Sequence, residues 1–206
     1  ASGKGRGRGD VAIISPAQAI NVEVYMAKLT LCSDWLDVCS GCHMSLLDID
    51  EVLVALLDSV QLLSTPITDL KHPPEEGADI GILTGAVSND HQEAVAKRMR
   101  ERVKILISMG DCSVFGGICA MRNFFDAEQV LQYAYTETDS TAPGQQVPRS
   151  PEIAKLYPKV RPLRDVVKVD YYIPGCPPSA NTIAYVLTEL VAGREPKWTD
   201  ELLRYG

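Results

Sequence analysis

Three stretches of this sequence combine a strand pattern with cysteines just beyond it. Residues 27–32, 105–109 and 167–173 show the apolar runs or the apolar–polar alternation that is typical of β-strands. The cysteines that follow these stretches are Cys39, Cys42, Cys112 and Cys176. In an open α/β sheet, the loops beyond the carboxyl ends of parallel strands gather at one edge. We therefore expect four thiols that are distant in the sequence to meet at one edge of a sheet.

Helical and strand patterns alternate along residues 25–206, which we interpret as one domain. Further strands are expected at 60–64 and 78–87, and one helix is expected over 45–58, where apolar residues recur at helical spacing. Ser179 is expected to cap the last helix, and residues 138–162 have little periodicity. The pattern predicts a flavodoxin-like, doubly wound parallel sheet of about five strands, with an irregular loop before the last strand.

Residues 1–24 show no clear period and begin with a basic, glycine-rich run, so we expect an extension that contacts a partner subunit. The net charge of −7 argues against nucleic acid as a partner. No apolar run is long enough to span a membrane, and the start lacks the apolar region of a secretory signal, so a cytoplasmic protein is expected. Dinucleotide-binding, phosphate-loop and Ser/His/Asp patterns are missing, so we predict no catalytic residues in this chain.

The cysteines carry the functional signal. The chain has six of them: Cys32, Cys39, Cys42, Cys112, Cys119 and Cys176. In a cytosolic chain of this size, metal binding accounts for such a set better than a disulfide framework does. The residues alone leave open an iron–sulfur cluster, structural zinc or a thioredoxin-like dithiol. Cys32, within a predicted strand, and Cys119 are expected to be core residues and not ligands.

Four motifs carry a resemblance to a known family. They are Cys39-Ser40-Gly41-Cys42-His43, Gly110-Asp111-Cys112 with Gly116-Gly117, Ala120-Met121-Arg122-Asn123, and Pro174-Gly175-Cys176-Pro177-Pro178. Together they resemble the small (delta) subunit of soluble, bidirectional NAD-reducing [NiFe] hydrogenases. The resemblance implies that one proximal [4Fe-4S] cluster is bound by Cys39, Cys42, Cys112 and Cys176. It also implies partners, namely a large subunit with the nickel–iron centre and the iron–sulfur and flavin diaphorase subunits that reduce NAD+.

Departures from related subunits refine this hypothesis. Membrane-bound and periplasmic hydrogenase small subunits carry more Cys and His motifs after the Pro-Pro pair, whereas residues 177–206 contain neither, so one cluster is expected. The related subunit of NADH:quinone oxidoreductase has adjacent cysteines, whereas Ser40 and Gly41 separate them here. That subunit type, another cytosolic [NiFe] hydrogenase and a zinc-stapled scaffold stay open as alternatives. His43 is expected at the surface or at an interface. The flavodoxin-like shape would also allow a bound flavin, but the sequence has no flavin-specific motif.

Overall fold

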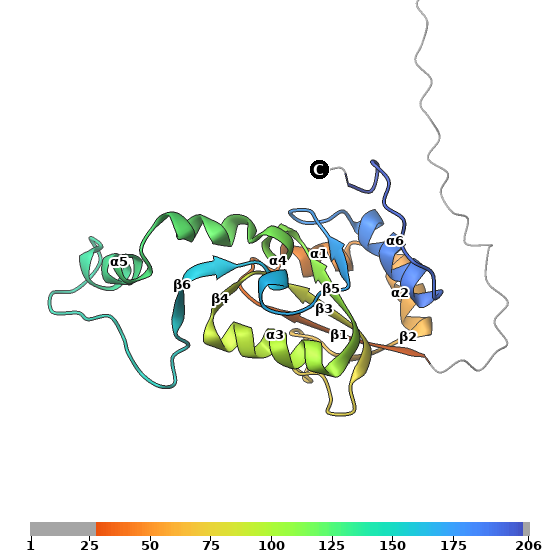
Figure 1. The fold of residues 1–206 in the computed structure, drawn as a ribbon, viewed down its shortest axis with the longest axis horizontal. Coiled ribbons are helices and arrows are strands. Elements are labelled where there is room, and N and C mark those ends of the chain that lie inside the picture. Colours follow the sequence, from red (N-terminus) through yellow and green to blue (C-terminus); the bar gives the residue numbers. More distant parts are fainter. Residues whose placement is uncertain (1–27, 204–206) are drawn as a thin grey trace, which may run out of the picture.

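The strand patterns of the sequence form one parallel sheet, which is shown in Figure 1. Its strands are β1 (Leu29–Trp35), β2 (Val60–Ser64), β3 (Ala78–Thr84), β5 (Val103–Met109) and β7 (Tyr171–Ile173). They lie in the order β2-β1-β3-β5-β7, and every neighbouring pair is parallel, which is the order of flavodoxin-like folds. The predicted fold is therefore confirmed. The computed structural model describes residues 28–203, so the predicted extension over residues 1–24 lies outside the described residues.

Helices cover both faces of the sheet. They are α1 (Gly41–Leu47), α2 (Glu51–Ser59), α3 (Asp90–Arg102), α4 (Asp111–Phe115), α5 (Ala127–Gln132) and α6 (Ala180–Val191), together with the 3-10 helices η1 (Gly117–Phe124) and η3 (Leu163–Asp165) and the π-helical turn η2 (Tyr133–Glu137). Ile80 and Ile82 of β3 pack with α1, α2 and α6, whereas Leu83 packs with α3 on the opposite face. Because both faces are covered, the central strand is apolar along nearly its whole length. Within residues 28–203, no helix combines the length and apolar character needed to cross a membrane.

Side-chain caps set the starts of two helices, and the cap at Ser179 is the one that the sequence analysis predicted. The Asn89 side chain accepts a hydrogen bond from the Gln92 amide at 2.8 Å at the start of α3. Ser179 accepts one from the Thr182 amide at 3.2 Å at the start of α6. After α6, Gly193 takes a φ of 69°, a left-handed value that ends a helix. Polar caps thus fix where the chain leaves the carboxyl edge of the sheet and enters these two helices.

The prediction of a single helix over residues 45–58 is wrong. α1 ends at Leu47 and α2 begins at Glu51, and Asp50 between them has a φ of 54°, which a continuous right-handed helix excludes. The apolar spacing suggested one helix because both helices turn apolar residues toward the same core. These residues are Leu46, Leu53 and Leu56.

Three other boundaries differ from the prediction. The strand expected over 78–87 ends at Thr84, and β4 (Val87–Asn89) follows Gly85, whose φ is 91°. β6 (Leu156–Arg161) pairs antiparallel with β4, although the stretch 138–162 was expected to be irregular throughout. Of the strand expected over 167–173, the structure pairs only β7 with β5. Figure 1 shows α5 and the loop after it projecting away from the sheet.

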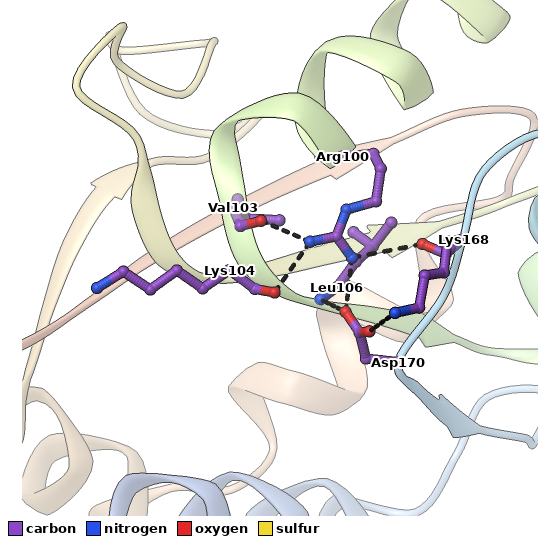
Figure 2. A network of polar contacts seen from close by, with 6 residues as sticks. All are labelled: Arg100, Val103, Lys104, Leu106, Lys168 and Asp170. Atoms are coloured by element: carbon purple, nitrogen blue, oxygen red, sulfur yellow. Dashed lines mark hydrogen bonds and ion pairs between the residues drawn. The ribbon is translucent and has the colours of Figure 1, made fainter.

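A polar network holds the chain that enters β7, as Figure 2 shows. Arg100, near the end of α3, donates to the carbonyl oxygens of Val103 at 2.6 Å and Lys104 at 2.9 Å. Its other terminal nitrogen pairs with Asp170 at 2.5 Å, and that carboxylate also accepts from the Leu106 amide at 2.8 Å. β7 has only three residues, so this network replaces the strand hydrogen bonds that a longer strand would make.

Candidate cluster-binding site

The loops after β1, β5 and β7 bring the four predicted ligands to the carboxyl edge of the sheet. Cys39 lies in the loop after β1, and Cys42 lies in the first turn of α1. Cys112 lies in the first turn of α4, after β5, and Cys176 lies in the loop after β7. All four are free thiols, of which Cys42 and Cys112 are buried and Cys39 and Cys176 are exposed. The topology thus places them together, and their role as ligands stays a prediction.

Two glycines leave room for the buried sulfur atoms. A Cβ atom at Gly110, where φ is 89°, would lie 2.3 Å from the Cys42 Sγ and 3.7 Å from the Gly175 carbonyl oxygen. A Cβ atom at Gly117, where φ is 47°, would lie 2.8 Å from the Cys112 nitrogen and 3.0 Å from its Sγ. Both positions need glycine for backbone conformation and for space. The Cys42 sulfur therefore lies directly against the loop that carries Cys112, next to the loop that carries Cys176.

Hydrogen bonds join the cysteine loops to one another. The Asp111 amide donates to the Gly175 carbonyl oxygen at 2.8 Å, and the Gly175 amide donates back to Asp111 Oδ1 at 2.8 Å. The Ser45 hydroxyl of α1 donates to the Pro178 carbonyl oxygen at 2.5 Å and is buried. Each loop is thus held by a neighbouring loop, which restrains the backbone that carries the thiols.

His43 ties the Cys42 turn to the sheet. Its Nε2 lies 3.2 Å from the Ser33 hydroxyl, and its Nδ1 lies 3.3 Å from the Thr84 hydroxyl. Its ring lies at 77° to the Trp35 ring with 5.6 Å between ring centroids, and only 5% of the residue is exposed. The expectation of a surface histidine is therefore wrong. Burial lowers the pKa of His43, which favours the neutral form of the ring between the two hydroxyl groups.

The four cysteines lie close enough for their charges to interact. Burial raises the pKa of the Cys42 thiol to about 12, and negative charge on the other three contributes next, in the order Cys112, Cys39 and Cys176. The pKa of Cys176 is also raised, by burial first and then by Cys112. Thiolates gathered in this way oppose one another's ionisation, and metal ligation requires the thiolate. The donor set therefore fits a group that carries positive charge and binds soft sulfur ligands.

The two remaining cysteines differ from each other. Cys32 is fully buried in β1, as expected of a core residue. Cys119 is only partly buried, and its thiol donates to the Asp37 carbonyl oxygen at 3.1 Å, so the prediction of a core position is wrong for it. Burial, followed by the charge of Asp37, raises the pKa of Cys119 to about 12. Among residues 28–203, no group of three or more His, Cys, Asp or Glu side chains is arranged to hold a metal ion.

Comparison with known proteins decides the family. The family described as NADH ubiquinone oxidoreductase, 20 Kd subunit, matches residues 39–190, a range that contains all four edge cysteines. The chain belongs to this family. Proteins named as hydrogenase subunits are similar to the chain along most of its length, so individual relatives show which branch of the family it resembles.

The relatives point to the hydrogenase branch. The delta subunit of the NAD-reducing hydrogenase HoxS of Cupriavidus necator is 41% identical over 196 residues, which cover 93% of this chain and 91% of that subunit. A subunit of the F420-non-reducing hydrogenase vhu of Methanocaldococcus jannaschii is 40% identical, over 86% of this chain and 59% of that protein. The chain thus spans nearly all of the bacterial subunit and somewhat more than half of the archaeal one.

A solved structure agrees in fold and sequence. A chain in the crystal structure of an NAD+-reducing [NiFe]-hydrogenase in the H2-reduced state superposes with a TM-score of 0.84 and 38% identity, covering 87% of this chain and 100% of that chain. A [NiFeSe] hydrogenase of Desulfomicrobium baculatum superposes with a TM-score of 0.52 and 15% identity, which shows the common fold alone. The resemblance to the small subunit of an NAD-reducing hydrogenase is therefore confirmed.

Proposed function

We propose that this chain is the electron-transfer small subunit of a cytoplasmic NAD-reducing [NiFe] hydrogenase and that it binds one [4Fe-4S] cluster. The observation that carries the proposal is that four free cysteines, from three separate loops, lie at the carboxyl edge of the sheet, close enough for their charges to interact. The similarity to the delta subunit of an NAD-reducing hydrogenase supports the reaction, in which electrons pass between H2 and NAD+. The chain itself contributes no catalytic residue to either half of that reaction.

The proposed ligands are Cys39, Cys42, Cys112 and Cys176. When bound, a [4Fe-4S] cluster supplies reversible transfer of single electrons, at a potential set by its surroundings. Around it, Gly41 directs its amide at the Cys39 sulfur at 3.4 Å, a hydrogen bond of the kind that orients and tunes a sulfur ligand. Buried Cys42 and Cys112 form the inner wall of the site, whereas exposed Cys39 and Cys176 lie at its open side. The open side suits a site that is closed by a partner.

An exposed apolar surface next to the site supports such a partner. We name it the η1 apolar face, and it consists of Phe115, Ile118, Met121, Phe124 and Phe125, each more than half exposed. It begins beside Gly117, which lies against Cys112. Surfaces of this composition mark protein–protein contacts. We assign it to the large subunit that carries the nickel–iron centre, with the iron–sulfur and flavin diaphorase subunits as further partners, and residues 1–24 as a second segment in contact with a partner.

The test is a Cys176→Ser variant, produced with its partner subunits and purified as the complex. We expect the cluster to be lost or converted, because serine supplies a harder and less readily ionised ligand than thiolate. Iron and acid-labile sulfide would fall, the broad visible absorbance would weaken, and H2-dependent NAD+ reduction would be lost. The diaphorase activity, NADH-dependent dye reduction by the partner subunits, should survive.

Cys32→Ala is the matched control, because Cys32 lies in the core, outside the site. It should keep iron, sulfide and hydrogen oxidation, with a loss of stability of about 1 kcal/mol from the smaller side chain. An intact cluster and full hydrogen oxidation in Cys176→Ser would refute the ligand assignment. Zinc in place of iron in the unmodified complex would instead support a structural scaffold.

A further inference from the structure

The residue that follows each buried cysteine of the site is itself polar and buried. His43 follows Cys42 in the first turn of α1, and Ser113 follows Cys112 in the first turn of α4. Polar side chains are usually kept at the surface, and a buried one needs hydrogen-bond partners. The partners of these two residues lie on the strands of the sheet, so we asked what the contacts do for the cysteines beside them.

His43 joins the turn of Cys42 to two strands at once. Its Nε2 lies 3.2 Å from the hydroxyl group of Ser33 on β1, and its Nδ1 lies 3.3 Å from the hydroxyl group of Thr84 at the end of β3. Both hydroxyl groups belong to buried residues. A neutral imidazole has one donor nitrogen and one acceptor nitrogen, so both are used here. The first turn of α1 therefore cannot tilt without breaking one of these hydrogen bonds.

Ser113 makes the corresponding contact for Cys112. Its hydroxyl group lies 2.7 Å from that of Ser108, and both residues are fully buried. Ser108 lies on β5, the strand that leads into the loop of Cys112, just as Ser33 lies on the strand that leads into the loop of Cys42. The same arrangement thus occurs twice: the chain leaves a strand, supplies a buried cysteine, and is tied back to that strand by the next residue.

The two exposed cysteines are followed by residues of another kind. Ser40 is only partly buried, and Pro177 has no polar side chain. The buried sulfur atoms also have less room to move, because a Cβ atom at Gly110 would lie 2.3 Å from the Cys42 Sγ. A small shift of α1 would press this sulfur against the loop of Cys112. The inner cysteines are therefore the pair whose positions need to be fixed.

We propose that His43 and Ser113 are positioning residues, which hold the sulfur atoms of Cys42 and Cys112 in place for the cluster. The proposal rests on the proposed function and deepens it, because it assigns the contacts that retain the cluster. Apolar side chains of the same shape could stabilise the fold about as well as a buried polar pair. Hydrogen bonds add direction, and a fully satisfied buried network specifies one arrangement of the groups around it.

The experiment substitutes the strand partners, so that the sequence of each cysteine loop stays unchanged. Thr84→Val removes one hydroxyl group bonded to His43 and keeps the shape of the side chain, and Ser108→Ala removes the partner of Ser113. Each variant is purified as the whole complex and incubated with an iron chelator and a thiol-alkylating reagent. Peptide mass spectrometry then follows the alkylation of the cysteines of this chain.

Both variants should lose the cluster roughly tenfold faster than the unmodified complex, as is usual when a group that supports a metal ligand is removed. The order of alkylation should differ between them. Cys42 should react ahead of Cys112 in Thr84→Val, whereas Cys112 should react ahead of Cys42 in Ser108→Ala. A general loss of stability would not produce this reversal, and Ser108→Ala keeps the test open if Thr84→Val does not fold.

Two further variants are controls. Ser88→Ala also removes a buried hydroxyl group, which lies 2.9 Å from Gln92 Oε1 on β4, outside the cysteine loops. It should leave the rate of cluster loss within about twofold of the unmodified complex, because it supports no ligand. Thr84→Ser keeps the hydroxyl group next to His43 and should restore most of the retention that Thr84→Val loses.

Three results would overturn the assignment. They are an unchanged rate of cluster loss in Thr84→Val and Ser108→Ala, an equal acceleration in Ser88→Ala, and a rate in Thr84→Ser as high as that in Thr84→Val. A Cys176→Ser complex that keeps its iron and its hydrogen oxidation would instead refute the proposed function. The failure of the positioning role and the failure of the ligand assignment are therefore distinguishable.

Discussion

The two edges of the parallel sheet are built in opposite ways. At the amino edge, carboxylates accept hydrogen bonds across strands: Asp79 of β3 receives the Thr30 amide and hydroxyl, each at 2.8 Å, and the Lys104 ammonium at 2.7 Å. Asp170 plays the same part between β5 and the chain that enters β7 (Figure 2). At the carboxyl edge, glycines with positive φ values make room for thiols whose charges oppose one another.

The amino edge stabilises the fold, whereas the carboxyl edge carries the candidate functional site. The amino edge is complete within the chain, because its charged groups have partners of opposite charge. The carboxyl edge gathers thiols that oppose one another's ionisation, so a positively charged group is needed to hold them together as thiolates. Substitutions at the amino edge should therefore change stability and leave the cluster site unchanged. Substitutions at the carboxyl edge should change the cluster and leave the sheet in place.

The largest effect is expected for Gly110→Ala. The added Cβ would meet the Cys42 sulfur at 2.3 Å, so Cys42 would be displaced from the loops of Cys112 and Cys176. We expect most of the iron and of the H2-dependent NAD+ reduction to be lost, while far-ultraviolet circular dichroism keeps its normal shape. Iron analysis of the purified complex measures the first effect.

Gly144→Ala separates this contact from backbone strain. Gly144 has a φ of 84°, close to the 89° of Gly110, but a Cβ there would meet nothing within 4 Å. Both alanines carry a conformational strain of about 1–3 kcal/mol, and only one of them touches a sulfur. Equal loss of iron in the two variants would show that strain, not the approach to Cys42, is responsible.

An intermediate effect is expected for Asp170→Ala at the other edge. The change leaves the Leu106 amide without the Asp170 acceptor and removes the carboxylate that pairs with the Arg100 guanidinium, which costs about 2–3 kcal/mol of the free energy of unfolding. Chemical denaturation monitored by circular dichroism measures it. Lys168→Ala is the control, since Lys168 is 83% exposed and lies 3.8 Å from the same carboxylate, a pair worth at most about 1 kcal/mol. Similar losses for both variants would contradict the part assigned to Asp170.

The parallel sheet, and the carboxyl edge at which the cysteines lie, could be predicted from the sequence alone. Apolar runs and alternation follow from burial, so the five strands, their order and the cap at Ser179 could be predicted. The break at Asp50 and the pairing of β4 with β6 could not. The break depends on one residue, Asp50, that takes a positive φ. The pairing of β4 with β6 joins two short segments that are distant in the sequence, and it leaves no periodic pattern of apolar residues in either of them.

The candidate site was predicted at the level of residue type and place in the fold. Its supports were not predicted, because the loop-to-loop hydrogen bonds of Asp111 and Ser45 join residues distant in the sequence. A polar residue next to a cysteine, as in Gly110-Asp111-Cys112, is a signal that could have pointed to the hydrogen bond of Asp111. His43 was misplaced for the same reason, since its partners Ser33 and Thr84 lie on two strands that only the folded sheet brings beside it.

The smallest effect is expected for Asp79→Asn, and it depends on pH. Hydrogen bonds from Lys104 and Thr30 lower the pKa of Asp79 from its ordinary 3.8 to about 2. A lowered pKa stabilises the fold above pH 3.8, and this contribution disappears as the pH falls through about 2. In chain prepared without iron, urea denaturation should show Asp79→Asn to be about 1 kcal/mol less stable at pH 7, with the difference shrinking toward pH 2. A difference that did not change with pH would mean that amino-edge stability comes from shape and not from the charge of this carboxylate.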